Sequence, residues 1–260
     1  MPKKLKEGLS ATTVTSFHNV LHKALDNAVR WNLIPRNVCD MVSPPRRKRF
    51  EIQPLNREQI QQFLEVAKDH PNRALFILAL ATGMRRGELL GLKWRDIHFA
   101  TGTLEIHRIL TRVPTKVPGK GFVEAEPKTE KSRRNIILAP FALDVLKQHR
   151  ARQLEAKLKA GPKWEEHDYV FCTSVGTHLN PDRDVLFQLK KLLKQAGLPD
   201  IRFHDLRHSA ATLLLSMGVH PKVVQEILGH SQIAMTLDVY SHVLPTMQQE
   251  AMNKLNDALQ

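Results

Sequence analysis

Hydrophobic residues near the start of the chain recur every three or four positions between residues 10 and 31. Five of them share this spacing: Val14, Phe17, Leu21, Leu25 and Ala28. Such a repeat places one apolar stripe along an α-helix. We therefore predict an amphipathic helix over this segment.

A basic segment that contains proline separates this helix from the rest of the chain. Pro44 and Pro45 are followed directly by Arg46, Arg47 and Lys48. Proline restricts the backbone and a run of charge has little to bury, so such a stretch is typical of a connection between domains. We place a first domain at residues 1–45, a linker at 46–54 and a second domain at 55–260.

The second domain begins with helical patterns. Asn56 and Gln59 have the spacing of a capping box, which predicts a helix that continues towards Val66. A second helix is predicted over residues 72–81, and it ends at Gly83.

The pattern then changes to β and back to helix. Residues 103–109 and 135–138 are β-rich, and a long stretch rich in Pro, Gly and Lys joins them as a basic hairpin. Helical spacing returns at residues 140–158, a short strand is predicted at 168–172, and three or four helices fill most of the remainder. The predicted fold class is therefore α+β, mainly helical with a small antiparallel sheet.

The composition indicates a folded protein with a polyanionic partner. Of the 260 residues, 42% are hydrophobic and 25% are charged, which is ordinary for a globular protein and excludes collagen-like and disordered chains. Lys and Arg number 39 against 26 Asp and Glu, which gives a net charge of +13. This excess attracts phosphate-rich polymers, although ribosomal, membrane-surface and heparin-binding proteins share the property.

The two cysteines, Cys39 and Cys172, lie far apart and neither belongs to a C-x-x-C pair. Neither a disulfide framework nor a cysteine-rich zinc site is therefore expected. No apolar run approaches the roughly 20 residues that cross a bilayer, and no apolar signal segment follows the first residues. We expect a cytoplasmic protein that does not span a membrane.

Residues 204–208 read His-Asp-Leu-Arg-His and open a predicted helix with two distinct faces. At about 100° per residue, one face is apolar and consists of Leu206, Ala210, Leu213, Leu214 and Met217. The neighbouring face gathers His204, Arg207, His208 and Ala211. This helix therefore has a core side and a side on which polar groups can act.

The segment that follows contains one of the two tyrosines of the chain. A short helix is predicted between Pro221 and Gly229, because proline favours the first helical position and glycine the end. His230 comes next, and Tyr240 lies ten residues further on. The other tyrosine, Tyr169, neighbours Val170 and Phe171 in a predicted strand and is interpreted as a core residue.

Five motifs occur in a fixed order. They are Thr82-Gly83-Met84-Arg85-Arg86-Gly87-Glu88-Leu89-Leu90 with Trp94-Arg95-Asp96-Ile97, Pro127-Lys128-Thr129 before Ser132-Arg133-Arg134, His204-Asp205-Leu206-Arg207-His208, Leu228-Gly229-His230, and Tyr240. In this order the chain resembles the tyrosine recombinases, the phage and transposon integrase family. The resemblance implies a site-specific DNA recombinase that works without a metal or another cofactor and without ATP, and that integrates or excises a mobile element.

The resemblance also implies how the reaction is divided among residues. Tyr240 attacks the scissile phosphate to give a 3′-phosphotyrosine, and Lys128 protonates the leaving 5′ oxygen. Arg85 and Arg207 clamp the phosphate, because a guanidinium can give two hydrogen bonds to its non-bridging oxygens. Three further residues are assigned: His204 as proton acceptor or donor near the tyrosine, His230 as hydrogen-bond donor to the phosphate, and Glu88 as a carboxylate that supports Arg85.

The resemblance further implies how the chain binds DNA and assembles. Residues 1–45 correspond to the last part of a helical core-binding domain, and residues 55–260 to the catalytic domain. Double-stranded DNA is the expected partner at the nucleoid, with contacts from Arg46, Arg47, Lys48 and Arg133. DNA-bending or excision accessory factors are possible further partners.

The last residues form a second amphipathic pattern. Met247, Ala251, Leu255 and Leu259 repeat every four positions in the tail. In the family such a helix docks onto a neighbouring protomer, which predicts a homotetramer on DNA. The alternative is a helix that folds back onto its own core.

Two other functions compete with the recombinase. His204 and His208 at i and i+4 imitate a zinc-protease helix, but that motif normally carries Glu as its base, and it leaves Tyr240 and the arginines unexplained. The two short helices around Gly229 also allow a non-catalytic, helix-turn-helix DNA-binding protein. Binding alone does not require a set of His, Arg, Lys and Tyr, so the recombinase is the preferred interpretation.

Overall fold

The computed structural model describes residues 2–46, 53–113, 121–127 and 133–229, together with residues 252, 253, 255–257 and 259 of the tail. The chain divides into two compact units, Met1–Ile52 and Gln53–Gln260. The division falls inside the basic segment 46–54, and the assignment of the first unit to a core-binding domain stays a prediction.

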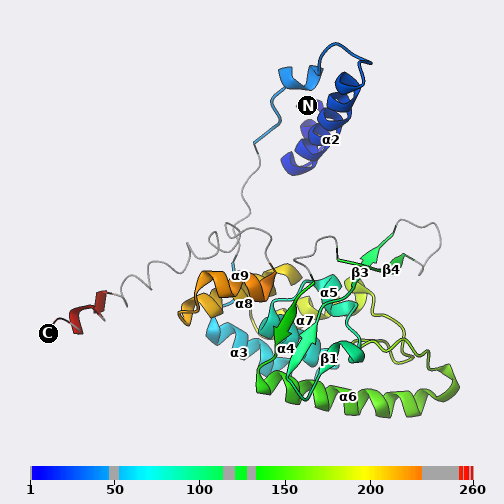
Figure 1. Ribbon diagram of the computed structural model, residues 1–260, viewed down its shortest axis with the longest axis vertical. Helices are drawn as coiled ribbons and strands as arrows, with labels where there is room; N and C mark the ends of the chain where they lie inside the picture. Colours follow the sequence, from blue (N-terminus) through cyan, green and yellow to red (C-terminus); the bar gives the residue numbers. More distant parts are fainter. Residues whose placement is uncertain are drawn as a thin grey trace. The chain divides into compact units, whose positions relative to one another are not determined.

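The first unit contains a long helix and two short ones. These are α1 (Pro2–Lys6), α2 (Ala11–Arg30) and η1 (Val38–Met41), drawn in blue in Figure 1. The Ser10 hydroxyl caps α2 by accepting the Thr13 backbone N–H at 3.1 Å, so the predicted helix is confirmed. Of its apolar stripe, Val14 is buried but Phe17 and Leu21 remain 56% and 54% exposed, because the described part of this unit has too few elements to cover them.

The second unit is built mainly from helices. They are α3 (Arg57–Val66), α4 (Arg73–Thr82), α5 (Arg86–Leu90), η2 (Trp94–Asp96), α6 (Pro140–Ala160), η4 (Gly161–Lys163), the π-helical η5 (Pro181–Leu186), α7 (Phe187–Gln195), α8 (Phe203–Ser216) and α9 (Pro221–Leu228). The α4 helix packs against both α6 and α8, while α9 lies beside α8 and α3 beside α7 (Figure 1). The core lies between these helices and includes Phe63, Phe76 and Leu206.

Local signals explain where these helices begin and end. Asn56 and Gln59 exchange backbone-to-side-chain hydrogen bonds of 2.8 and 3.0 Å, which confirms the predicted capping box. Gly83 has a φ of +59° and ends α4 in the left-handed conformation that favours glycine. Gly229 ends α9 in the same way, with a φ of +67°. The sequence therefore predicts these helix ends correctly.

The β-strands form two small antiparallel sheets. One has the order β1 (Ile97–His98), β2 (Thr103–Glu105), β5 (Asn135–Ile137), with Leu104 opposite Ile136. The other is a hairpin of β3 (Ile109–Arg112) and β4 (Phe122–Ala125). These strands and the helices confirm the predicted fold class.

The single strand predicted at residues 103–109 is wrong, because the segment divides between the two sheets. Arg108 lies at the change between them, and its guanidinium bonds the buried carboxylate of Asp96. This ion pair lies between the end of β2 at Glu105 and the start of β3 at Ile109, where the chain passes from one sheet to the other.

The strand predicted at residues 168–172 is also wrong. Only isolated bridges form there, between Lys93 and Tyr169 and between Cys172 and His178. Side chains from α6 take the carbonyls that a neighbouring strand would use, since His149 contacts the Val170 oxygen at 2.8 Å. Tyr169 is 7% exposed, which confirms its prediction as a core residue.

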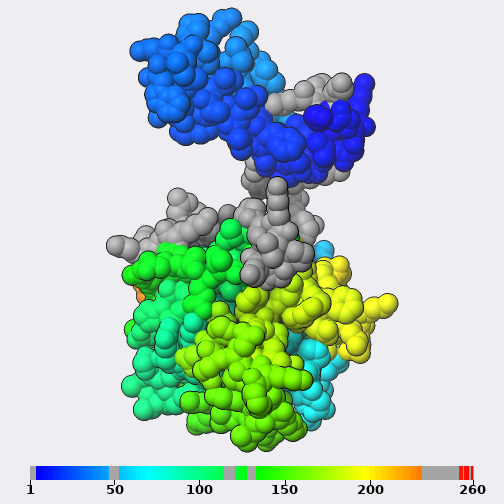
Figure 2. Space-filling model, turned by 90° about the vertical axis from the view of Figure 1, so that its right-hand side faces the viewer, coloured from blue at the N-terminus to red at the C-terminus, as the bar shows by residue number. Residues whose placement is uncertain are grey.

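The described part of the second unit is closely packed. In Figure 2 its segments coloured from teal to yellow form one continuous surface. Across the part of the chain that the structure describes, no helix combines the length and the apolar character required of a membrane span.

Candidate active site

The turn between α4 and α5 positions Arg85. Gly83 reverses the chain, and Arg85 then stands directly before α5. Glu88, one turn into α5, accepts the Arg85 backbone N–H at 2.9 Å and its Nη1 at 2.7 Å. The same carboxylate thus caps the helix and fixes the guanidinium.

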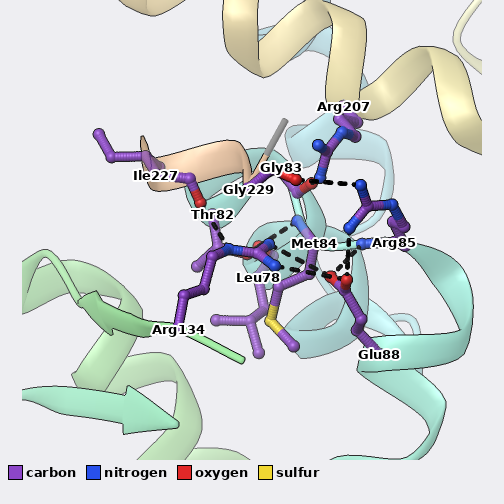
Figure 3. A network of polar contacts seen from close by, with 10 residues as sticks. All are labelled: Leu78, Thr82, Gly83, Met84, Arg85, Glu88, Arg134, Arg207, Ile227 and Gly229. Carbon is purple, nitrogen blue, oxygen red and sulfur yellow. Dashed lines mark hydrogen bonds and ion pairs between the residues drawn. The ribbon is translucent and has the colours of Figure 1, made fainter. Parts of the chain in front are cut away.

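Arg207, on α8, contacts the same turn between α4 and α5. It is buried, and its Nη1 donates to the Gly83 carbonyl at 2.7 Å. Arg85 in turn donates from Nη2 to the Gly229 carbonyl at 3.1 Å (Figure 3). Two arginines separated by more than 120 positions are therefore brought together by the carbonyls of two glycines that end helices.

A third arginine, Arg134, completes this cluster. It precedes β5 and its Nε donates to the Ile227 carbonyl at 2.9 Å, while Nη2 lies 3.2 Å from Glu88 Oε2 (Figure 3). From the sequence, Arg133 was predicted to contact DNA, whereas Arg134 was given no role. The adjacent residues of an extended segment point to opposite sides, and this alternation could have separated the buried arginine from the exposed one.

The cluster carries an excess of positive charge. Arg85, Arg134 and Arg207 are three guanidinium groups against one carboxylate, Glu88, which leaves a charge of +2. Burial, reinforced by the charges of Arg85 and Arg134, lowers the pKa of Arg207 to about 9, so that it still carries its charge at pH 7. Burial works to raise the pKa of Glu88, but Arg134 and Arg85 outweigh it and hold this pKa below its usual value. An anion would be attracted to such a site.

His204 lies on α8 one turn from His208, with ring centroids 5.0 Å apart. Burial lowers the pKa of His204 to about 4, and the charges of His208 and Arg207 act in the same direction. His204 is therefore neutral near pH 7 and able to accept a proton.

Asp205, which follows His204, stabilises the start of α8. Its carboxylate accepts the Arg202 backbone N–H at 2.8 Å and bonds the Arg202 guanidinium, which caps α8. Among the residues that the structure describes, no third metal-binding side chain joins the histidines in a group that could hold an ion.

The faces of α8 agree with the sequence only in part. Leu206 and Ala210 are buried as predicted, but Met217 is 69% exposed and its prediction as a core residue is wrong. Ala211 is buried although it was placed on the polar face. The reason is that α9 packs on this side, where Ala211 shares a small apolar cluster with Leu228.

Several predicted site residues lie outside the described residues. They are Lys128, His230, Tyr240, Arg47 and Lys48, together with Met247 and Ala251 of the tail. Arg133 is described, is half exposed and bonds Glu126 at 2.6 Å, and Arg46 is exposed. Leu255 and Leu259 are helical and at least 50% exposed.

Solved structures have a similar fold. The Tn1549 transposon integrase in complex with transposon right end DNA has a TM-score of 0.79 at 23% identity, over 98% of this chain and 82% of that one. A lambda integrase dimer bound to a COC′ core site has a TM-score of 0.62 at 18% identity, over 92% of this chain and 61% of that one. These similarities show the fold.

Sequence relatives extend the comparison beyond the fold. A "tyrosine recombinase XerC-like" protein of Caldanaerobacter subterraneus subsp. tengcongensis is 37% identical over 98% of this chain and 68% of its own length. The "ICEBs1 integrase" of Bacillus subtilis is 30% identical with the same coverage. The model of the phage integrase family matches residues 53–247. The chain therefore belongs to the phage integrase family, the tyrosine-type site-specific recombinases.

Proposed function

We propose that the chain cleaves and rejoins DNA at specific sites through a 3′-phosphotyrosine formed by Tyr240. The observation that carries this proposal is the cluster in which the partly exposed Arg85 and the buried Arg207 meet with an excess of positive charge. A phosphodiester gathers negative charge on its non-bridging oxygens during attack, and two fixed guanidinium groups stabilise that charge. Burial lowers the pKa of Arg207 and the charges of Arg85 and Arg134 lower it further; an arriving phosphate would offset these charges.

The reaction then needs a nucleophile and two proton transfers. The Tyr240 oxygen forms a bond to phosphorus as the bond from phosphorus to the 5′ oxygen breaks. The tyrosine proton passes to His204, which is neutral near pH 7, and Lys128 gives a proton to the 5′ oxygen. A 5′ hydroxyl of another strand reverses these steps, so that rejoining requires neither metal nor ATP.

We further propose that this chemistry serves the integration or excision of a mobile element. This proposal is supported by the similarity of the chain to the Tn1549 transposon integrase and to the ICEBs1 integrase. The DNA-bound state of the similar structures and the net charge of +13 support double-stranded DNA as partner. Such a protein would work at the nucleoid.

Assembly is part of the proposal. The exposed Leu255 and Leu259 support a tail that packs on a second copy, in a homotetramer on DNA with accessory factors that bend it. Deletion of residues 245–260 should then abolish junction formation. If this deletion leaves cleavage and junction formation normal, assembly through the tail is wrong.

The deciding experiment uses a nicked DNA duplex that carries a candidate attachment sequence, with EDTA present. The unmodified chain should form a covalent protein–DNA band on a denaturing gel, and the Tyr240→Phe variant should form none. If neither protein forms the band while both shift DNA on a native gel, the chain is a non-catalytic DNA-binding protein.

A further inference from the structure

Arg134 donates to the protein from each nitrogen of its guanidinium group. Its Nε donates to the Ile227 carbonyl at 2.9 Å, and its Nη1 and Nη2 lie 3.4 and 3.2 Å from the two oxygens of Glu88 (Figure 3). Its side chain is 8% exposed, against 37% for that of Arg85. Each of the three nitrogens thus donates to the protein and little of the side chain reaches the surface, so Arg134 is not arranged to hold a substrate phosphate itself.

We infer that Arg134 is a positioning residue for the phosphate site, one that keeps the charge of Arg85 available and holds the end of α9 in place. This inference rests on the proposed strand cleavage and adds a residue to it. Two lines of contact lead from Arg134, one to Arg85 and one to the segment before His230.

The first line runs through Glu88. Its buried carboxylate receives Arg85 Nη1 at 2.7 Å on one oxygen and the Arg85 backbone N–H at 2.9 Å on the other, and Arg134 contacts both oxygens. A buried carboxylate demands compensation by positive charge. The positive charge of Arg134 compensates the negative charge of Glu88. The positive charge of Arg85 therefore remains available to act on an anion.

The second line runs to the last turn of α9. The carbonyl of Ile227 accepts from Arg134, and that of Gly229 accepts from Arg85. A Cβ added at Gly229 would lie 2.8 Å from Arg134 Nη1, so the guanidinium packs directly against this glycine. Glu88 joins the two arginines, and together they fix the backbone that leads into His230.

The test compares two variants with the unmodified chain on the nicked duplex. Arg134→Met removes the charge and all hydrogen bonds, while Arg134→Lys keeps the charge and loses the planar fork. Loss of a supporting partner should slow single-turnover cleavage at saturating DNA roughly ten- to hundredfold, by analogy with groups that orient a ligand. The dissociation constant for DNA should change by less than about threefold, since the interaction acts on the transition state.

A second substrate distinguishes a positioning role of Arg134 from a general loss of structure in the variants. A neutral methylphosphonate at the scissile position develops less negative charge, so cleavage should depend less on Arg85. The defect of either variant should therefore shrink on this substrate. An arginine from an exposed ion pair provides the matched control, because Arg183→Met breaks contacts to Asp184 without touching the cluster.

Each outcome decides the matter. If a folded Arg134 variant cleaves the ordinary phosphate within twofold of the unmodified rate, or is equally defective on both substrates, the inference is wrong. If Arg134→Met does not fold, as judged by its thermal transition, Arg134→Lys decides by the same criteria. If the unmodified chain forms no covalent complex with Tyr240 intact, the proposed function fails and this inference fails with it.

Discussion

At the scale of single residues, the site depends on two backbone carbonyls as much as on its charged side chains. Gly83 and Gly229 each end a helix with a positive φ, and their carbonyls accept from Arg207 and Arg85. Carbonyls at a helix end lack partners within the helix and carry partial negative charge. A guanidinium placed against such a carbonyl is held in position while most of its charge is retained.

Gly83→Ala should therefore impair both stability and cleavage. A Cβ at Gly83 would overlap the Leu228 side chain, and a left-handed backbone costs a non-glycine residue about 1–2 kcal/mol. Denaturant unfolding should show a loss of at least that size. The matched control is Gly218→Ala, which has a φ of +79° but nothing within 4 Å of the added Cβ. Equal losses for the two variants would contradict the packing argument.

His204→Gln should weaken the dependence of stability on pH. The folded chain holds the pKa of His204 near 4, whereas an unfolded histidine titrates near 6.5. Between these values the unfolded state binds a proton that the folded state does not, so stability falls as the pH falls from about 7 towards 4. The free energy of unfolding, measured at pH 7.5 and 5, should differ less in the variant. An unchanged difference would show that His204 titrates normally.

At the scale of elements, α8 connects the site to the start of the second unit. The Ser209 hydroxyl donates to the Asp205 carbonyl at 2.8 Å and accepts the Leu55 backbone N–H at 2.9 Å. Both Ser209 and Leu55 are buried, and 154 positions separate them. This single hydroxyl fixes the entry of the chain into the domain against the helix that carries Arg207.

Ser209→Ala should cost about 1–3 kcal/mol of unfolding free energy, because it leaves the buried Leu55 N–H without its acceptor. Ser216→Ala on the same helix is the control, since that exposed hydroxyl bonds only the Leu213 carbonyl. Urea unfolding of both variants measures the difference. A cost as small as that of the control would mean that the backbone readjusts around Leu55.

Elements whose ends are set locally could be predicted from the sequence. Residue types and spacing predict the caps at Asn56, Gly83 and Gly229, and these caps define the start of α3 and the ends of α4 and α9. The strand at residues 135–138 was also predicted, as β5 shows, but the strands predicted at 103–109 and 168–172 were wrong, because tertiary contacts such as the pair of Arg108 with Asp96 decide which segments pair.

The candidate site could be predicted only as a set of charged side chains. Motifs named Arg85, Glu88 and Arg207, which the structure brings together. They could not name the carbonyls that hold the arginines, because every residue has a carbonyl. Arg134 was missed because its role depends on burial beside Glu88, whereas a basic residue in a basic segment is ordinarily expected to be exposed.

At the scale of the whole molecule, positive charge is distributed unequally. Residues 1–52 hold ten Lys and Arg against four Asp and Glu, a net charge of +6, and residues 53–260 hold 29 against 22, a net charge of +7. The first unit thus carries nearly half of the net charge on a fifth of the chain. Sequence-independent attraction to phosphate should depend strongly on this part.

Replacing Arg46, Arg47 and Lys48 with Gln should make DNA binding less sensitive to salt. Each phosphate contact contributes about 0.9 to the slope of log affinity against log salt concentration, so the slope should decrease by up to about 2.7. Fluorescence anisotropy at several salt concentrations measures it. The control removes an equal charge from α6 by replacing Lys147, Lys157 and Lys159 with Gln, all of them exposed.

The comparison of the two triple variants separates contact from overall charge. If the linker residues contact phosphates, only their replacement reduces the slope, because released counterions are counted per contact and not per net charge. If both variants reduce the slope equally, the basic segment attracts DNA only as part of the total charge. Affinity would then come from the field of the whole molecule, and site choice would depend on contacts made elsewhere in the chain.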